Sequence, residues 1–248
     1  MLRLLMLLSL LWGAQARSEL VIEITEGVDD PIPVAFVPFR WQGSGALPLE
    51  LADLIENNMK RTGLFSATPR ENMLSRPSQG DQVVFRDWRL IESEYLVIGR
   101  VIPEGAGVVV EYELFDVFGQ ASLLSERIPG TPAQLRDIGH FISDRVFEKL
   151  TGQRGIFSTK LAYVTVEHRS DKDQTYRLMY SDADGARPIA IFQSTQPILS
   201  PTWSPEGQRI AYVSYESGRP EIYIQELSSG AKTIMTDPEC EITSASFL

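Results

Sequence analysis

Cysteine and histidine are scarce in this sequence of 248 residues, and their scarcity excludes several kinds of site. Cys240 is the one cysteine, so no disulfide can form within the chain. His140 and His168 are the two histidines, and neither belongs to a paired catalytic or zinc motif. A surface or packing role is therefore the simplest interpretation of His140. We expect a fold held together by burial, with no metal and no cofactor.

Basic residues are also in deficit, since 23 Lys and Arg stand against 33 Asp and Glu and the formal net charge is −10. An acidic chain without a basic stripe is a poor candidate for binding nucleic acid or an anionic membrane surface. No stretch beyond the first residues approaches the roughly 18 apolar residues of a membrane-spanning helix, so we expect no direct membrane insertion. Nucleophile-elbow, metalloprotease and phosphate-loop motifs are absent as well. The sequence predicts no enzyme.

Residues 1–16 have the pattern of a secretory signal peptide. A short positive start at Arg3 precedes the almost wholly apolar run 4–12, and Ala14-Gln15-Ala16 is a small-x-small cleavage site. A buried helix is the alternative interpretation of the same pattern. We expect export to the periplasm with cleavage after Ala16, which removes Arg3 and makes the mature chain still more acidic.

The segment 17–30 contains one alternating strand. Leu20, Ile22 and Ile24 share one of its faces, and Asp29-Asp30-Pro31 ends it. A strand near a free terminus can detach at little cost in core packing and add to the sheet edge of another protein. Alternatively, it completes the sheet of its own domain. The candidate docking residues are Glu19, Leu20, Val21, Ile22, Glu23, Ile24 and Thr25.

Residues 31–154 have the pattern of one α/β domain, with a mixed sheet and two main helices. Apolar residues at helical spacing and a glycine stop predict the main helices, and Trp88 is expected to anchor a shorter one. The expected helices are 48–61, 85–92 and 132–150; the expected strands are 32–39, 95–102, 108–115 and 122–128.

Residues 155–248 change to short strands with an internal repeat. The run 161–164 matches 210–213, and 176–185 matches 221–230, at offsets of 49 and 45 residues. A β-propeller blade has a period of roughly 40–50 residues. Between the repeats we expect a buried tryptophan, a tight turn and a core tyrosine, at Trp203, Pro205, Gly207 and Tyr212.

Asp182-Ala183-Asp184-Gly185 begins like a calcium-binding loop. The residues that follow lack the further oxygen ligands and the closing glutamate of an EF-hand. A hairpin turn is the better interpretation, because Asp and Gly supply the backbone conformations that such turns need.

The run 201–214, PTWSPEGQRIAYVS, resembles the TolB repeat, a WD40-like blade. PVAFVPF at 33–39, RTGLF at 61–65, DWR at 87–89 and GIFSTKLAY at 155–163 occur in the order of the TolB amino-terminal domain. The resemblance covers nearly all of the mature chain. It implies an adaptor of the Tol-Pal system, which links the inner and outer membranes, supports outer-membrane integrity and constriction at division, and is used by some bacteriocins for import. It also implies that strand 19–25 docks on the periplasmic domain of TolA and that the propeller face binds the lipoprotein Pal.

The sequence departs from this family in length. Family propellers have six blades, whereas residues 155–248 supply about one and a half to two, so we expect a product truncated within an incomplete propeller. Pal binding is then expected to be lost or unstable, because its surface would come from several absent blades. Two alternatives remain: a non-catalytic propeller lid of a serine peptidase, and a ligand-binding domain ending near residue 154 with a vestigial tail.

Overall fold

The computed structural model describes residues 30–47, 49–170 and 173–235. The chain divides into two units, Met1–Asp30 and Pro31–Leu248, and every element below belongs to the second. The predicted signal peptide, the predicted docking strand 19–25, Pro48 and Cys240 lie outside the described residues.

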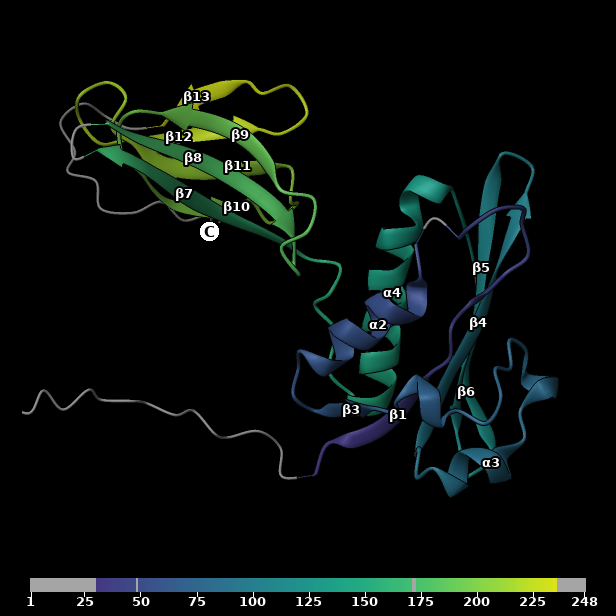
Figure 1. Cartoon of the computed structure of the whole chain (residues 1–248). Coiled ribbons are helices and arrows are strands. Elements are labelled where there is room, and N and C mark those ends of the chain that lie inside the picture. The colour runs from purple at the N-terminus through teal and green to yellow at the C-terminus, as the bar shows by residue number, and fades with distance from the viewer. Residues whose placement is uncertain (1–29, 48, 171–172, 236–248) are drawn as a thin grey trace, which may run out of the picture. The chain divides into compact units, whose positions relative to one another are not determined.

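Within this second unit, residues 32–130 form a mixed six-stranded sheet (Figure 1). Its strand order is β3-β1-β4-β5-β6, with β2 also paired to β4; β1 runs parallel to β3 and β4, whereas β4, β5 and β6 are antiparallel. Pro33 is the second residue of β1 and Pro38 lies beyond its end, so neither proline interrupts the middle of the strand. The two shortest strands, β2 and β3, were not predicted. The bounds are β1 Ile32–Phe36, β2 Arg40–Trp41, β3 Phe65–Ala67, β4 Tyr95–Glu104, β5 Gly107–Asp116 and β6 Ala121–Gly130.

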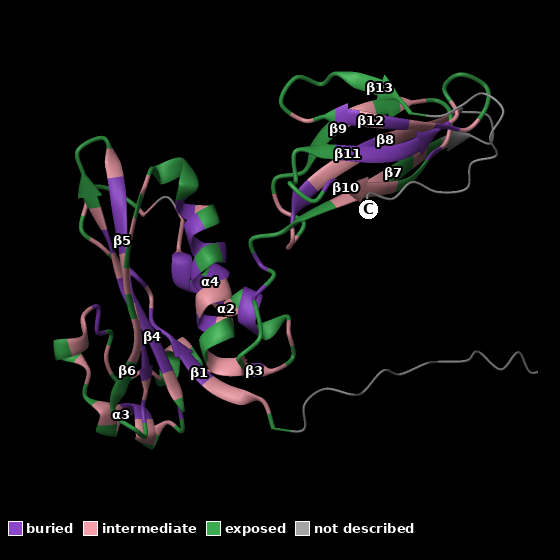
Figure 2. Ribbon diagram, turned by 180° about the vertical axis from the view of Figure 1, so that it is seen from behind, coloured by how far each residue is buried: buried purple, intermediate pink, exposed green. Residues whose placement is uncertain are grey.

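Helices α2 (Leu51–Lys60) and α4 (Leu135–Thr151) bury their apolar stripes against one core of this sheet. In α4 the buried residues include Leu135, Ile138, Ile142 and Val146, at the three- and four-residue spacing predicted. A 3-10 turn, Pro132–Gln134, precedes α4, and Gly152 ends it with φ 74°, a left-handed conformation that glycine adopts without strain. Figure 2 shows buried residues along both helices.

The opposite face of the sheet is covered by the short helix α3 (Phe85–Leu90). Trp88 is 1% exposed and packs with Ala35 and Leu96, so it anchors the helix as predicted. Strand β1 serves both cores, because Val34 and Phe36 face the helices α2 and α4 while Ala35 faces α3.

Two antiparallel sheets follow, β7-β8-β9 and β10-β11-β12-β13. A third core, which includes Leu178, Ile210 and Tyr212, joins residues of both. Neither sheet closes into a ring within the described part of the chain, as expected of an incomplete propeller. Within that part, no helix has both the length and the apolar character needed to cross a membrane. The bounds are β7 Lys160–Ser170, β8 Asp173–Asp182, β9 Ile189–Ser194, β10 Ile198–Trp203, β11 Arg209–Ser214, β12 Glu221–Glu226 and β13 Lys232–Ile234.

Candidate functional site

The predicted propeller residues fall into two groups. Trp203, which was expected to be buried, is only partly buried; it packs against the third core and meets Tyr180 edge to face with ring centroids 6.0 Å apart. Tyr212 is buried in that core as expected and stacks on Tyr223 at 5.8 Å. Pro205 and Gly207 lie instead in the exposed turn between β10 and β11. The docking strand 19–25 lies outside the described residues, and its role stays a prediction.

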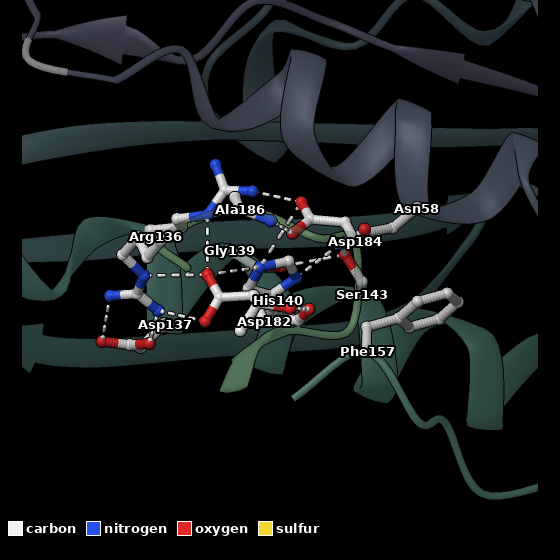
Figure 3. A network of polar contacts seen from close by, with 12 residues as sticks. Asn58, Arg136, Asp137, Gly139, His140, Ser143, Phe157, Asp182, Asp184 and Ala186 are labelled. Atoms are coloured by element: carbon white, nitrogen blue, oxygen red, sulfur yellow. Dashed lines mark hydrogen bonds and ion pairs between the residues drawn. The ribbon is translucent and has the colours of Figure 1, made fainter. Parts of the chain in front are cut away.

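A different group of side chains is brought together around the end of β8 (Figure 3). Helix α4 supplies three members, the start of β7 one, and the end of β8 with its following turn three. We call this group the junction cluster: Arg136, Asp137, His140, Lys160, Asp182, Asp184 and Arg187.

Helical spacing explains how α4 contributes. Arg136, His140 and Asp144 are four residues apart, so they form one stripe along the helix. Arg136 and His140 face the turn after β8. Asp144 accepts hydrogen bonds from the backbone N–H groups of Phe157 at 2.7 Å and Ser158 at 3.1 Å. The stripe thus contacts two segments that follow the helix in the chain.

Asp182 is the centre of the junction cluster and is only 2% exposed. Its Oδ1 accepts from Lys160 Nζ at 2.5 Å and from Arg187 at 3.0 Å. Its Oδ2 accepts from Arg136 Nε at 2.9 Å and Arg187 Nε at 2.8 Å. Burial by itself raises the pKa of Asp182, but the hydrogen bonds from the three cations outweigh burial and hold the pKa well below its usual value.

The other two carboxylates are bound in the same way. Asp184 pairs with Arg136 and accepts from the backbone N–H of Ala186 at 3.1 Å. Asp137 pairs with Arg187, whose hydrogen bond lowers the pKa of that carboxyl. Gly185 donates its N–H to the Asp182 carbonyl at 2.9 Å, so this run forms a turn between β8 and β9, as predicted.

His140 lies between this charged group and helix α2 and is 2% exposed, so the packing interpretation is confirmed. Its Nδ1 lies 3.0 Å from the Asn58 amide nitrogen, which also donates to Ser143 Oγ at 2.9 Å. Its Nε2 faces Asp182 Oδ2 at 3.8 Å and Asp184 Oδ2 at 3.9 Å and makes no hydrogen bond. Burial lowers the pKa of His140 below its ordinary value, although the two carboxylates act in the opposite direction.

His140, Asp182 and Asp184 have the spacing of a metal site, since one ligand atom from each lies within 4.8 Å of the others. The surroundings do not fit a cation. Every oxygen of Asp182 already accepts from Lys160 or an arginine, and three cationic side chains balance the three carboxylates of the cluster. A divalent ion would have to displace these pairs and bring excess positive charge into a buried space. The geometry favours a structural junction.

Sequence reasoning missed the junction cluster. It interpreted Asp182 and Asp184 only as turn-forming residues and gave no role to Arg136, Lys160 or Arg187. The available signal was weak: an arginine and a histidine four residues apart on α4, and an aspartate at the end of β8.

Two family models match the chain. The TolB amino-terminal domain matches residues 20–123, and the TolB beta propeller domain matches residues 147–247. This is the order of domains that the sequence motifs indicated.

Curated relatives and a solved structure agree with these matches. The chain is 43% identical over 236 residues to the Tol-Pal system protein TolB of Pseudomonas putida, covering 95% of this chain and 54% of the relative. The corresponding protein of Pseudomonas aeruginosa is 45% identical over 227 residues, covering 92% and 52%. The crystal structure of TolB from Acinetobacter baumannii superimposes with a TM-score of 0.74 at 33% identity, covering 86% of this chain and 51% of that one. The chain spans about half the length of the curated relatives it matches.

Proposed function

The chain belongs to the TolB family, and from that premise we propose that it is a periplasmic, non-catalytic adaptor that binds proteins of the Tol-Pal system. The single observation that carries the proposal is the match to the TolB amino-terminal domain from residue 20 onward, which includes the candidate docking residues Leu20–Thr25. The relatives that align with 95% and 92% of this chain are named Tol-Pal system protein TolB. The predicted serine-peptidase lid is not favoured, because both domain matches are to TolB domains.

The proposed mode of binding is strand addition. The alternating residues Leu20, Ile22 and Ile24 would place one apolar face on the partner, while backbone N–H and C=O groups pair with its sheet edge. The proposed partner of this segment is the periplasmic domain of TolA. Pal is the proposed partner of the complete family propeller, of which this chain includes a part.

Titration calorimetry of the mature chain, residues 17–248, with the TolA periplasmic domain tests the proposal. Deletion of residues 17–30 is expected to abolish the binding heat. Ile22→Pro is expected to weaken binding at least tenfold, because proline removes a backbone donor that strand addition uses.

Ile22→Val is the matched control, since valine keeps both the donor and a β-branched apolar side chain; its affinity is expected to stay within a few-fold of the parent. Equal binding by the parent and the deletion variant would remove strand 19–25 as the docking site. Absence of binding by every form would contradict the TolA assignment.

A further inference from the structure

His140 is a buried ionisable group that the proposed adaptor function does not use. It is 2% exposed and contacts two other segments, Asn58 on α2 and the end of β8 with its turn. The same Asn58 amide also donates to Ser143 on α4. The polar stripe of α4 therefore meets the β8–β9 turn at an imidazole, the side chain whose ordinary pKa lies close to neutral pH.

The hydrogen bonds around Asn58 define the protonation of the imidazole. Ser143 Oγ donates to the Gly139 carbonyl, so it accepts from the Asn58 amide nitrogen. The Asn58 Oδ1 accepts from Arg61 at 3.2 Å, which keeps the amide nitrogen directed at His140 Nδ1. Nδ1 is therefore an acceptor without a proton, and Nε2 carries the single N–H of a neutral ring.

A second proton on the imidazole has no place in this arrangement. It would sit on Nδ1 and oppose the N–H of Asn58, and turning that amide over would direct its NH₂ at the Arg61 guanidinium. Protonation therefore requires the loss of at least one of the hydrogen bonds of Asn58.

The charges that face His140 are already balanced. Helix α4 contributes Arg136 and Asp137, β7 contributes Lys160, and the end of β8 with its turn contributes Asp182, Asp184 and Arg187; α2 presents the uncharged Asn58, with Arg61 behind it. The carboxylates nearest Nε2 attract a proton, but each is engaged by at least one cation. An imidazolium would add an unbalanced positive charge at His140, which is itself almost wholly removed from water.

From this geometry we infer that His140 is a proton-sensitive lock between α4 and the β8–β9 turn: the neutral ring permits the closed contact, and protonation opens it. The lock is independent of the proposed TolA docking.

The direction of the effect follows from linkage. Burial lowers the pKa of His140 in the closed state, whereas an opened, hydrated ring has the ordinary value of about 6.5. The closed contact is therefore fully stable above that pH. It weakens as the pH falls further, because the open state binds a proton that the closed state does not.

Two measurements on the whole mature chain test the lock. In NMR titration of the imidazoles, His140 is expected to titrate at a pH below the ordinary histidine value of about 6.5. In hydrogen exchange corrected for intrinsic rates, the opening equilibrium of the amides of Ala183, Gly185 and Ala186 is expected to rise by up to about tenfold per pH unit below about pH 6.5.

His140→Gln supplies a polar side chain that does not titrate, and its turn amides are expected to lose this pH dependence. His168→Gln is the matched control and is expected to behave as the parent. An ordinary titration of His140, or turn amides whose corrected exchange is independent of pH in the parent, would overturn the proposal. The imidazole titration requires no substitution at position 140, so the test stands even if His140→Gln folds poorly.

Discussion

At the scale of single residues, Asp182 shows how a buried charge is retained. Four hydrogen bonds from Arg136, Lys160 and Arg187 replace the water that the carboxylate loses at the end of β8. Lys160 and Arg187 keep 38% and 40% of their side chains exposed, so they remain partly hydrated while they donate. Asp182 therefore loses most of its hydration, and hydrogen bonds from the three cations together offset the free-energy cost of that loss.

Asp182→Asn is expected to lower the free energy of unfolding at pH 7 by about 2–4 kcal/mol, because three cations lose their shared partner. The pKa of Asp182 is held low in the folded chain, so this contribution is fully present above about pH 4 and is lost as the pH falls further. Urea denaturation at several pH values measures both effects, and the gap between parent and variant is expected to narrow in acid.

Asp137→Asn is the control within the same cluster. Asp137 is half-exposed and pairs chiefly with Arg187, so its loss is expected to cost clearly less than that of Asp182. If Asp182→Asn were as stable as the parent, the ion pairs of the cluster would only balance the cost of burying its charges, and the predicted net stabilisation would be wrong.

At the scale of elements, helix α4 makes contacts through two faces, one apolar and one polar. Its apolar stripe packs against the sheet, and its polar stripe of Arg136, His140 and Asp144 binds the segments that follow. The chain turns back onto this polar stripe at Gly155. A Cβ at Gly155 would lie 2.4 Å from the Cα of Asp144, so only glycine allows the approach.

Gly155→Ala is therefore expected to push the segment 155–158 away from Asp144 and to lower the free energy of unfolding by about 1–3 kcal/mol. Faster hydrogen exchange at the Phe157 amide, which donates to Asp144, reports the displacement directly. Arg154→Ala changes an exposed neighbour and serves as the control, with both quantities expected to stay at parental values. Unchanged exchange at Phe157 in Gly155→Ala would refute the close approach.

At the scale of the whole described molecule, the apolar cores of the mixed sheet and the apolar core of the two antiparallel sheets have no residue in common. Two cores belong to the mixed sheet and its helices, and the third belongs to the strands from β7 onward. Ion pairs from Arg136 of α4 to Asp182 and Asp184 connect these parts. Since apolar burial dominates stability, each part is expected to respond chiefly to changes in its own core.

Tyr212→Ala tests this separation. Tyr212 is fully buried between Phe192 and Tyr223, and its removal is expected to cost about 3 kcal/mol or more. Residue-resolved hydrogen exchange is expected to accelerate in β8, β11 and β12 and to stay unchanged in β4, β5 and α2. Tyr212→Phe keeps the ring and loses only the hydrogen bond to Gln225, so it is the conservative control. Equal acceleration in both parts would show a single cooperative unit.

Much of this architecture could be predicted from local pattern. The spacing of Leu135, Ile138, Ile142 and Val146 identified α4 and its buried face, and the repeat of 161–164 at 210–213 identified the propeller strands. Such patterns can be recognised because a helix or strand that buries one face needs an apolar residue at regular intervals of a few positions.

The sequence by itself determined the helices, the longer strands, the domain order and the family. Tertiary structure alone decided the parallel pairing of β1 with β3 and β4, and the convergence of Arg136, Lys160 and Arg187 on Asp182. The reason is physical: a charge pair needs only that two side chains meet in space. The separation of 46 positions from Arg136 to Asp182 imposes no spacing that a linear pattern could reveal.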